Sequence, residues 1–295
     1  MIIVRLLGGL GNQMFQYAIA RHLSILKKTT LKFDITGFNK DLYKEGGTIR
    51  NFGLNIFKIE PIIATDEDID IVKSSKPELL ERLRNRFLNK VISNEVYEQK
   101  LFSFDKNIFK SLSNTYLIGY WQSPKYFNSI RNILLKDFEL REIPTTNEYP
   151  FLDKIKKDNS VSIHIRRGDY SSNPEYFKIH GLCSIEYYQS AIECICKKIT
   201  NPVFYVFSDD MEWVKKNIQI KSTCIYVTEA NNEKDYFEMH LMSLCKHNII
   251  ANSSFSWWGA WLNQNPEKVV IAPKQWMNDP AIDTRDLVPA NWIRI

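Results

Sequence analysis

The sequence predicts an α/β protein built of two domains. Its 295 residues are enough for two domains of ordinary size. Residues 141–150, R-E-I-P-T-T-N-E-Y-P, contain two prolines and few apolar side chains, as is typical of a linker. Beyond this segment, apolar stretches alternate regularly with helical patterns, which predicts a parallel sheet with right-handed crossovers. We therefore expect a first domain at 1–145 and a second domain at 151–295.

The composition indicates a globular protein with an ordinary surface. Hydrophobic residues make up 44% of the chain, charged residues make up 25%, and the net charge is +5. This charge suits an anionic ligand, but the basic residues are too dispersed for a nucleic-acid-binding protein. The five cysteines lack metal-ligand spacing, so we expect reduced thiols, a cytoplasmic location and no metal site. The N-terminal apolar stretch ends at Gly8, which predicts neither a signal peptide nor a membrane anchor.

The first domain is predicted to begin with a strand at 2–7, a glycine loop, and a helix that runs to about residue 28. The loop reads Gly8, Gly9, Leu10, Gly11, Asn12 and Gln13. Its glycines allow a tight turn and the close approach of a ligand, and Asn12 can cap the helix, whose free N–H groups favour an anion. The loop lacks the lysine of a P-loop, and a tight turn with a capped helix is the alternative.

The rest of the first domain shows shorter patterns. We expect strands at 31–34 and 116–121, helices at 66–72 and 77–89, and an exposed loop at 40–51. The predicted helix at 77–89 is basic on one face. We expect this face to be exposed to solvent, and the alternative is that it makes peripheral contact with an anionic membrane surface. An aromatic cluster that includes Tyr120 and Trp121 either stacks on a sugar ring or fills a core.

The second domain is predicted to alternate strands with helices. The expected strands lie at 161–166, 203–207, 224–227, 248–251 and 268–272, and the expected helices lie at 184–198, 211–217, 234–246 and 255–263. In the first of these strands, His164 and Arg166 point the same way, and Asp169 follows on the loop. A half-buried arginine there is costly unless it meets an anion. The alternatives are a phosphate site and an internal ion pair of Arg166 or Arg167 with Asp169.

Polar residues follow two further strands of this domain. Asp209 and Asp210 follow the second strand, and Ser253 and Ser254 follow the fourth strand at the start of a helix. Because the carboxyl ends of parallel strands face one crevice, these residues and Arg166 are expected to converge on one ligand. The alternative is that each serine only caps its helix and that the nearby tryptophans only fill the core. The two carboxylates are compatible with a metal ion, but a phosphate site that contains arginine does not require one.

Five motifs in this order resemble those of the bacterial α-1,2-fucosyltransferases of glycosyltransferase family 11. They are G-G-L-G-N-Q-M-F-Q-Y-A, H-I-R-R-G-D-Y, F-S-D-D, L-M-S-L-C-K-H-N-I-I-A-N-S-S-F-S-W-W-G-A-W-L and A-P-K-Q-W. The resemblance covers residues 3–276. It implies a GT-B-like fold with two Rossmann-type domains facing a cleft, and inverting transfer of L-fucose from GDP-β-L-fucose to the 2-hydroxyl of a terminal galactose. It also implies that no metal or other cofactor is needed, and it implies a cytoplasmic enzyme with loose membrane contact.

The resemblance also implies roles for individual residues, by extension to the α-1,6- and protein O-fucosyltransferases that share H-x-R-x-x-D. Arg166 would hold the GDP pyrophosphate. His164 and Glu238 would recognise guanine, although the family commonly has Asp at the second position. The other donor-side residues would be Gly11, Gln13, Asp209, Ser253, Ser254 and Phe255. The catalytic candidates besides Arg166 are Asn12, which would reach the phosphates or the acceptor, and Asp169, which is a candidate base. Tyr120, Trp121 and Glu175 are acceptor-side candidates, and Glu175 is a second candidate base.

Three alternatives remain open on the sequence. One is a GDP- or glycan-binding protein without transfer activity, which the glycine loop and the aromatic residues equally permit. A second is an enzyme of the same fold that uses another donor or forms another linkage. A nucleic-acid-binding protein is the weakest, because no recognition module is present. The acceptor glycan and the oligomeric state do not follow from the residues.

Overall fold

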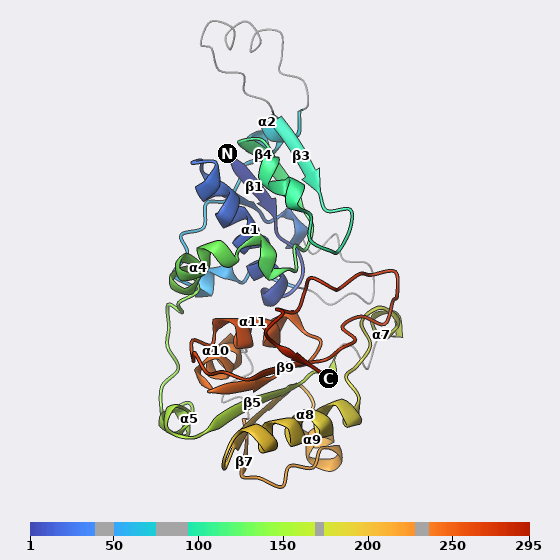
Figure 1. The fold of residues 1–295 in the computed structure, drawn as a ribbon. Helices are drawn as coiled ribbons and strands as arrows, with labels where there is room; N and C mark the ends of the chain where they lie inside the picture. Colours follow the sequence, from blue (N-terminus) through green and yellow to red (C-terminus); the bar gives the residue numbers. More distant parts are fainter. Residues whose placement is uncertain (39–49, 75–93, 169–173, 228–235) are drawn as a thin grey trace, which may run out of the picture. The chain divides into compact units, whose positions relative to one another are not determined.

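The computed structural model describes residues 1–38, 50–74, 94–168, 174–227 and 236–295 (Figure 1). These residues form two compact units. Unit 1 contains Met1–Arg141 and Arg285–Leu287, and unit 2 contains Glu142–Thr284 and Val288–Ile295. The chain therefore leaves unit 1 at the proline-containing segment and returns to it for three residues near the C-terminus.

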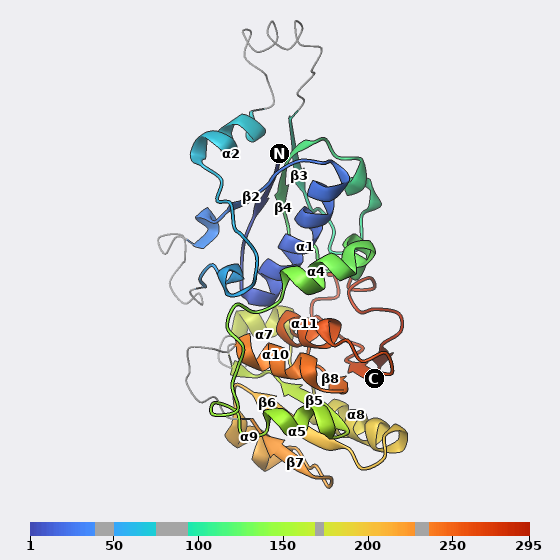
Figure 2. The same ribbon diagram turned by 90° about the vertical axis from the view of Figure 1, so that its left-hand side faces the viewer.

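Unit 1 is a four-stranded parallel sheet with the strand order β2-β1-β4-β3. Its strands are β1 (Ile2–Arg5), β2 (Leu31–Asp34), β3 (Asn94–Glu98) and β4 (Asn114–Ile118), and its helices are α1 (Leu10–Leu26), α2 (Asp66–Lys73) and α4 (Arg131–Asp137). Helix α2 covers one face through Ile69 and Val72, which pack on Ile3 and Tyr116, and α1 lies on the other face (Figure 2). Thr65 begins α2 with a capping box that uses the side chain of Asp68.

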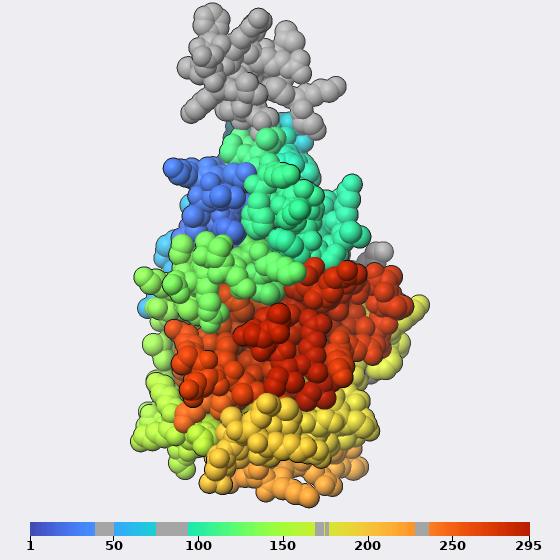
Figure 3. Space-filling view, viewed as in Figure 1, coloured from blue at the N-terminus to red at the C-terminus, as the bar shows by residue number. Residues whose placement is uncertain are grey.

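The segment Arg285–Leu287 is held in unit 1 by Asp286. The backbone N–H of Phe104 donates to the Asp286 carboxylate at 3.0 Å, and Lys125 lies 2.5 Å from its other oxygen. The Ser123 hydroxyl donates to the Asp286 carbonyl at 2.7 Å. The rest of the C-terminal segment, red in Figure 3, belongs mainly to unit 2 and ends in β10 (Ile293–Arg294).

Unit 2 is a six-stranded parallel sheet with the strand order β10-β9-β8-β5-β6-β7. Its strands before β10 are β5 (Ser160–Ile165), β6 (Val203–Ser208), β7 (Cys224–Tyr226), β8 (His247–Ile249) and β9 (Val270–Ala272). Its helices are α5 (Leu152–Lys157), α7 (Pro174–His180), α8 (Ile185–Lys198), α9 (Met211–Asn217), α10 (Tyr236–Leu244) and α11 (Ser254–Leu262). The predicted α/β class with two Rossmann-type domains is confirmed, because each unit contains a parallel sheet with helices packed on it.

Strand β5 is buried along its whole length, as expected for a central parallel strand. Val161, Ile163 and Ile165 belong to the core that α8 and α9 cover, and α10 and α11 lie on the other face (Figure 1). On that face, Asn248 donates to the Ser162 hydroxyl at 2.7 Å. The predicted alternation of the two faces of β5 is therefore correct, although the strand ends one residue before Arg166.

Several boundaries differ from those predicted. Strand β4 ends at Ile118, and not at residue 121, because the chain turns at Gly119, whose φ is +153°. Helices α4, α5 and α7 and strands β3 and β10 were not predicted, because they are short and have little apolar periodicity. The predicted basic helix at 77–89 lies outside the described residues, as does most of the predicted loop at 40–51. Among the described residues, no helix is both long and apolar enough to span a membrane.

Candidate functional site

The predicted ligand site lies at the switch point of the unit 2 sheet. The chain builds the sheet outward from β5 through β6 and β7 on one side, and through β8, β9 and β10 on the other. The carboxyl ends of β5 and β8 therefore flank the point where the winding reverses, which is where ligands bind in open α/β sheets. Arg166 follows β5, and Ser253 and Ser254 lie at the start of α11, after β8. The three strands whose polar ends were predicted to converge, β8, β5 and β6, are therefore neighbours, and their carboxyl ends lie on the same side of the sheet.

Arg166 is paired with a carboxylate of the neighbouring strand end. Its Nη1 lies 2.9 Å from Oδ2 of Asp209, and the two side chains are 27% and 24% exposed. The next arginine, Arg167, lies 3.2 Å from Asp210 through its Nε. Asp169, the partner considered from the sequence, lies outside the described residues. An internal ion pair and a phosphate-facing arginine are therefore not exclusive alternatives, because a guanidinium has five donors.

His164 is buried beside Arg166 and is held in its neutral form. Its ring is 6.0 Å from that of Phe255 on α11, and its Nδ1 has no hydrogen-bond partner. Burial, with a smaller contribution from the Arg166 charge, lowers the pKa of His164 to about 3. A neutral imidazole offers one donor and one acceptor, which suits recognition of a polar heterocycle.

The neutral state of His164 predicts a loss of stability in acid. The pKa of His164 is about 3 in the folded protein and 6.5 in the unfolded chain. Between these pH values the unfolded chain binds a proton at His164 that the folded protein does not bind. The free energy of unfolding therefore rises with pH over this range. At about pH 5 we expect His164 to lower the free energy of unfolding by about 2 kcal/mol relative to pH 7. Urea unfolding of the wild type and His164→Gln at both pH values measures this contribution. The same pH dependence in both proteins would contradict it.

The start of α11 is shaped by Ser253 and by the packing of α10. Ser253 caps the helix, because its hydroxyl accepts from the N–H of Phe255 at 3.3 Å. Ser254 and Phe255 are partly exposed in the first turn. Glu238 is 8% exposed on α10, and α10 approaches α11 closely at Gly259, where an added Cβ would lie 2.9 Å from Cβ of Met242. The helix pair therefore carries Glu238, Ser254 and Phe255 as one packed element.

In unit 1, the glycine loop departs from its predicted hydrogen bonding. Gly9 is the N-cap residue of α1 and Asn12 lies inside the helix, so the predicted capping by Asn12 is wrong. The Asn12 Oδ1 instead accepts from Nε2 of Gln122 at 2.8 Å, which orients the Asn12 amide. Gly8 has φ +74°, and a side chain there would meet the Asn12 Nδ2 at 2.7 Å. Glycine is therefore needed where Asn12 and the turn meet.

Gln13 and Gln16 of this motif are buried supports of unit 1. Gln13 donates to the carbonyls of Gly8 and Asn51 and accepts from the N–H of Gly53, so its whole amide is engaged within the unit. Gln16 accepts from the Leu7 N–H and donates to Gly119 O. Gln13 therefore shapes the loop in unit 1, and its predicted contact with the sugar nucleotide stays a prediction.

The two acceptor-side aromatic candidates are separated by burial. Trp121 is fully buried and packs edge-on against Tyr126 at 5.6 Å, so the core-filling alternative describes it. Tyr120 is 42% exposed and remains a candidate for a sugar contact. The side chain of Glu175 lies outside the described residues, although its backbone belongs to α7.

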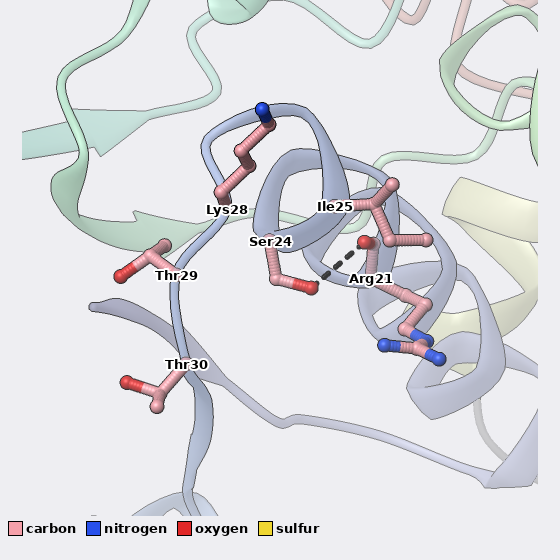
Figure 4. Close-up of a pocket in the computed structure, with 6 residues that line it drawn as sticks. All are labelled: Arg21, Ser24, Ile25, Lys28, Thr29 and Thr30. Carbon is pink, nitrogen blue, oxygen red and sulfur yellow. Dashed lines mark hydrogen bonds between the residues drawn. The ribbon is translucent and has the colours of Figure 1, made fainter.

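A shallow hollow at the other edge of unit 1 does not coincide with these residues. It is lined by Arg21, Ser24, Ile25, Lys28, Thr29 and Thr30 (Figure 4). Thr29 and Thr30 precede β2, so the hollow lies at the amino edge of the sheet, whereas the glycine loop follows the carboxyl end of β1. Arg21 is also paired with Asp137 at 3.0 Å. In the described parts of the chain, no cluster of three or more His, Cys, Asp or Glu side chains could hold a metal ion.

An arginine and a helix N-terminus at the switch point of a parallel sheet are typical of an α/β protein that binds a phosphate-bearing ligand. The chain belongs to glycosyltransferase family 11, because the family described as Glycosyl transferase family 11 matches residues 1–295. The resemblance drawn from the five motifs is therefore confirmed at the level of the family.

The relatives of this chain include two Escherichia coli proteins. It is 38% identical to an alpha-1,2-colitosyltransferase, over 100% of this chain and 98% of that protein. It is 35% identical to the O-antigen biosynthesis glycosyltransferase WbnK, over 91% of this chain and 92% of that protein. Among solved structures, the fucosyltransferase NodZ from Bradyrhizobium is 13% identical with a TM-score of 0.47, over 88% of this chain and 92% of that chain.

Proposed function

We propose that this protein transfers L-fucose from GDP-β-L-fucose to the 2-hydroxyl of a terminal β-galactoside, with inversion and without a metal ion, in the synthesis of a surface polysaccharide. Membership of glycosyltransferase family 11 supports the reaction class. The 38% identical relative is an alpha-1,2-colitosyltransferase, which supports the α-1,2 linkage. Binding of a GDP-sugar donor is supported by one observation above all. Arg166 and the start of α11 both lie at the switch point of the unit 2 sheet.

Arg166 and α11 would act on the leaving group. Breaking the bond between fucose and the β-phosphate increases the negative charge on GDP and places positive character on the sugar. A guanidinium matches two phosphate oxygens, and Ser254 lies in the first turn of α11, where the helix dipole favours an anion. Donors fixed at that phosphate stabilise the transition state more than the ground state, which accelerates transfer.

The guanine base would be bound by His164 and Glu238. Both side chains are buried, and a carboxylate accepts from the N1 and N2 donors of guanine. The proton of the acceptor hydroxyl would pass to Asp169 or Glu175, which follow β5 in the sequence, or to the departing phosphate. His164 is a poor candidate for this base, because burial lowers its pKa to about 3. Asn12, with its amide oriented by Gln122, would donate to the phosphates or to the acceptor.

Release of GDP from GDP-fucose in EDTA, with and without lactose, tests this function. We expect GDP release to depend on the galactoside and to survive EDTA, and the product linkage to be α-1,2 by NMR. Binding of GDP with no turnover of any nucleotide sugar would support a binding protein instead. Turnover that needs an added divalent ion would contradict the metal-independent mechanism.

A second donor is favoured by one observation, the 38% identity to an alpha-1,2-colitosyltransferase. Colitose differs from L-fucose by the absence of the 3-hydroxyl. A site that hydrogen-bonds this hydroxyl discriminates strongly against the deoxy sugar, whereas an apolar site discriminates weakly. The ratio of kcat/KM for GDP-fucose and GDP-colitose, measured with both donors in one mixture, decides between them.

A further inference from the structure

Two consecutive carboxylates after β6 engage two consecutive arginines after β5. The strands are parallel neighbours whose last paired residues are Ile165 and Ser208. The next two residues of each strand then form the pairs, Arg166 with Asp209 at 2.9 Å and Arg167 with Asp210 at 3.2 Å. The register of the sheet therefore sets both ion pairs.

Asp209 holds both the side chain of Arg166 and the backbone that follows it. Its Oδ2 contacts the Arg166 guanidinium, and its Oδ1 accepts from the Arg167 N–H at 2.8 Å. A Cβ at Gly168 would lie 2.5 Å from the same Oδ2, so this carboxylate fills the space that a side chain at 168 would need. One residue thus fixes three consecutive positions of the loop.

Arg167 is anchored away from the loop by α9. Its guanidinium carbon lies 3.8 Å from the centroid of the Trp213 ring, and its Nε contacts Asp210 Oδ2. Asp210 also caps α9, because its Oδ1 accepts from the Trp213 N–H at 3.2 Å. The side chain of Arg167 therefore has a structural role, because it fixes the start of the loop, next to Arg166, against α9.

We propose that Asp209 is a positioning residue that acts through Arg166 and does not itself contact the donor. This inference rests on the proposed function, in which Arg166 meets the GDP pyrophosphate. A carboxylate in direct contact with pyrophosphate would repel it, and the charge of Asp209 partly cancels that of Arg166. Its benefit is therefore geometric, since it keeps a long, flexible side chain in one orientation.

A double-mutant cycle tests this inference. We expect Asp209→Asn to lower kcat for transfer by ~10- to 100-fold, because a misplaced group near the reaction loses this much. In an Arg166→Ala background the same change should alter kcat less than about threefold, because there is then no arginine to position. Equal effects in both backgrounds would overturn the proposal, as would an Asp209→Asn enzyme with undiminished kcat.

Two controls separate positioning from folding and from net charge. Asp158→Asn removes the same charge in unit 2, at the amino edge of the sheet, where Asp158 accepts from the Tyr205 hydroxyl at 2.8 Å. This variant should keep wild-type kcat. Thermal unfolding of all variants shows whether a lower kcat reflects a smaller folded fraction.

A measurement without substrate keeps the inference separate from the choice of donor. The rate at which phenylglyoxal modifies Arg166, read by peptide mass spectrometry, reports how firmly its guanidinium is held. We expect Asp209→Asn to raise this rate severalfold and Asp158→Asn to leave it unchanged. If the wild type does not use GDP-fucose, the proposed function fails while this rate still decides the role of Asp209. An unchanged rate at Arg166 would overturn that role.

Discussion

Replacing Arg166 with alanine is expected to lower kcat/KM for transfer from GDP-fucose by about 10²- to 10³-fold. This is the usual cost of removing one hydrogen-bond donor from a developing oxyanion. The change removes the cation proposed to face the pyrophosphate. It also leaves Asp209 without the guanidinium that lies 2.9 Å away. The uncompensated carboxylate then repels the sugar nucleotide, so we expect a loss toward the upper end of this range. Initial rates of GDP release over a range of donor concentrations measure it.

Arg166→Lys separates charge from geometry. Lysine keeps the positive charge but cannot make the two parallel hydrogen bonds of a guanidinium, so we expect an intermediate loss. Lys58→Ala is the matched control for removal of a cation, because Lys58 pairs with Glu139 on the surface of unit 1, where both side chains are more than half exposed. If Arg166→Ala retained kcat/KM within about threefold of wild type, the proposed contact with the leaving group would be wrong.

The fold of unit 2 was largely predictable because its strands and helices leave strong local patterns. Helix α8 begins after Ser184, whose hydroxyl accepts from the Tyr187 N–H, and the sequence marks this start with a serine before an amphipathic stretch. Strand β10 has two residues and follows a long irregular segment, so no period could show it. The return of Arg285–Leu287 to unit 1 depends on contacts of Asp286 with residues more than 150 positions away, which no local pattern encodes.

The sequence predicts that the site lies at the carboxyl ends of the unit 2 strands, but it does not predict which side chains pair with one another there. Parallel strands bring their carboxyl ends together, which was enough to group Arg166, Asp209 and Ser254. The partners depend on the register, and aligning I-R-R at 165–167 with S-D-D at 208–210 along neighbouring strands would have found both ion pairs. The role of Gln122 carried no such signal, because its bond to Asn12 joins side chains 110 residues apart.

The tryptophans of F-S-W-W-G-A-W form a core whose loss is expected to be the largest stability change in unit 2. Trp258 is fully buried, and its ring centroid lies 5.1 Å from those of Trp257 and Trp261. Trp258→Ala should lower the free energy of unfolding of unit 2 by about 3–5 kcal/mol, through lost burial and an unfilled cavity. Guanidinium unfolding followed by tryptophan fluorescence measures this loss, because every tryptophan except Trp121 lies in unit 2.

Ile143→Ala, at a position 67% exposed in the same unit, is the matched control and should change stability by less than about 0.5 kcal/mol. If Trp258→Ala cost as little, the ring would not be the packed core residue that its burial indicates. A large loss of stability would indicate that the two parts of the F-S-W-W-G-A-W motif have different roles. Its tryptophans would hold α11 against the sheet and α10, and only the partly exposed first turn with Ser254 and Phe255 would be left to meet the donor.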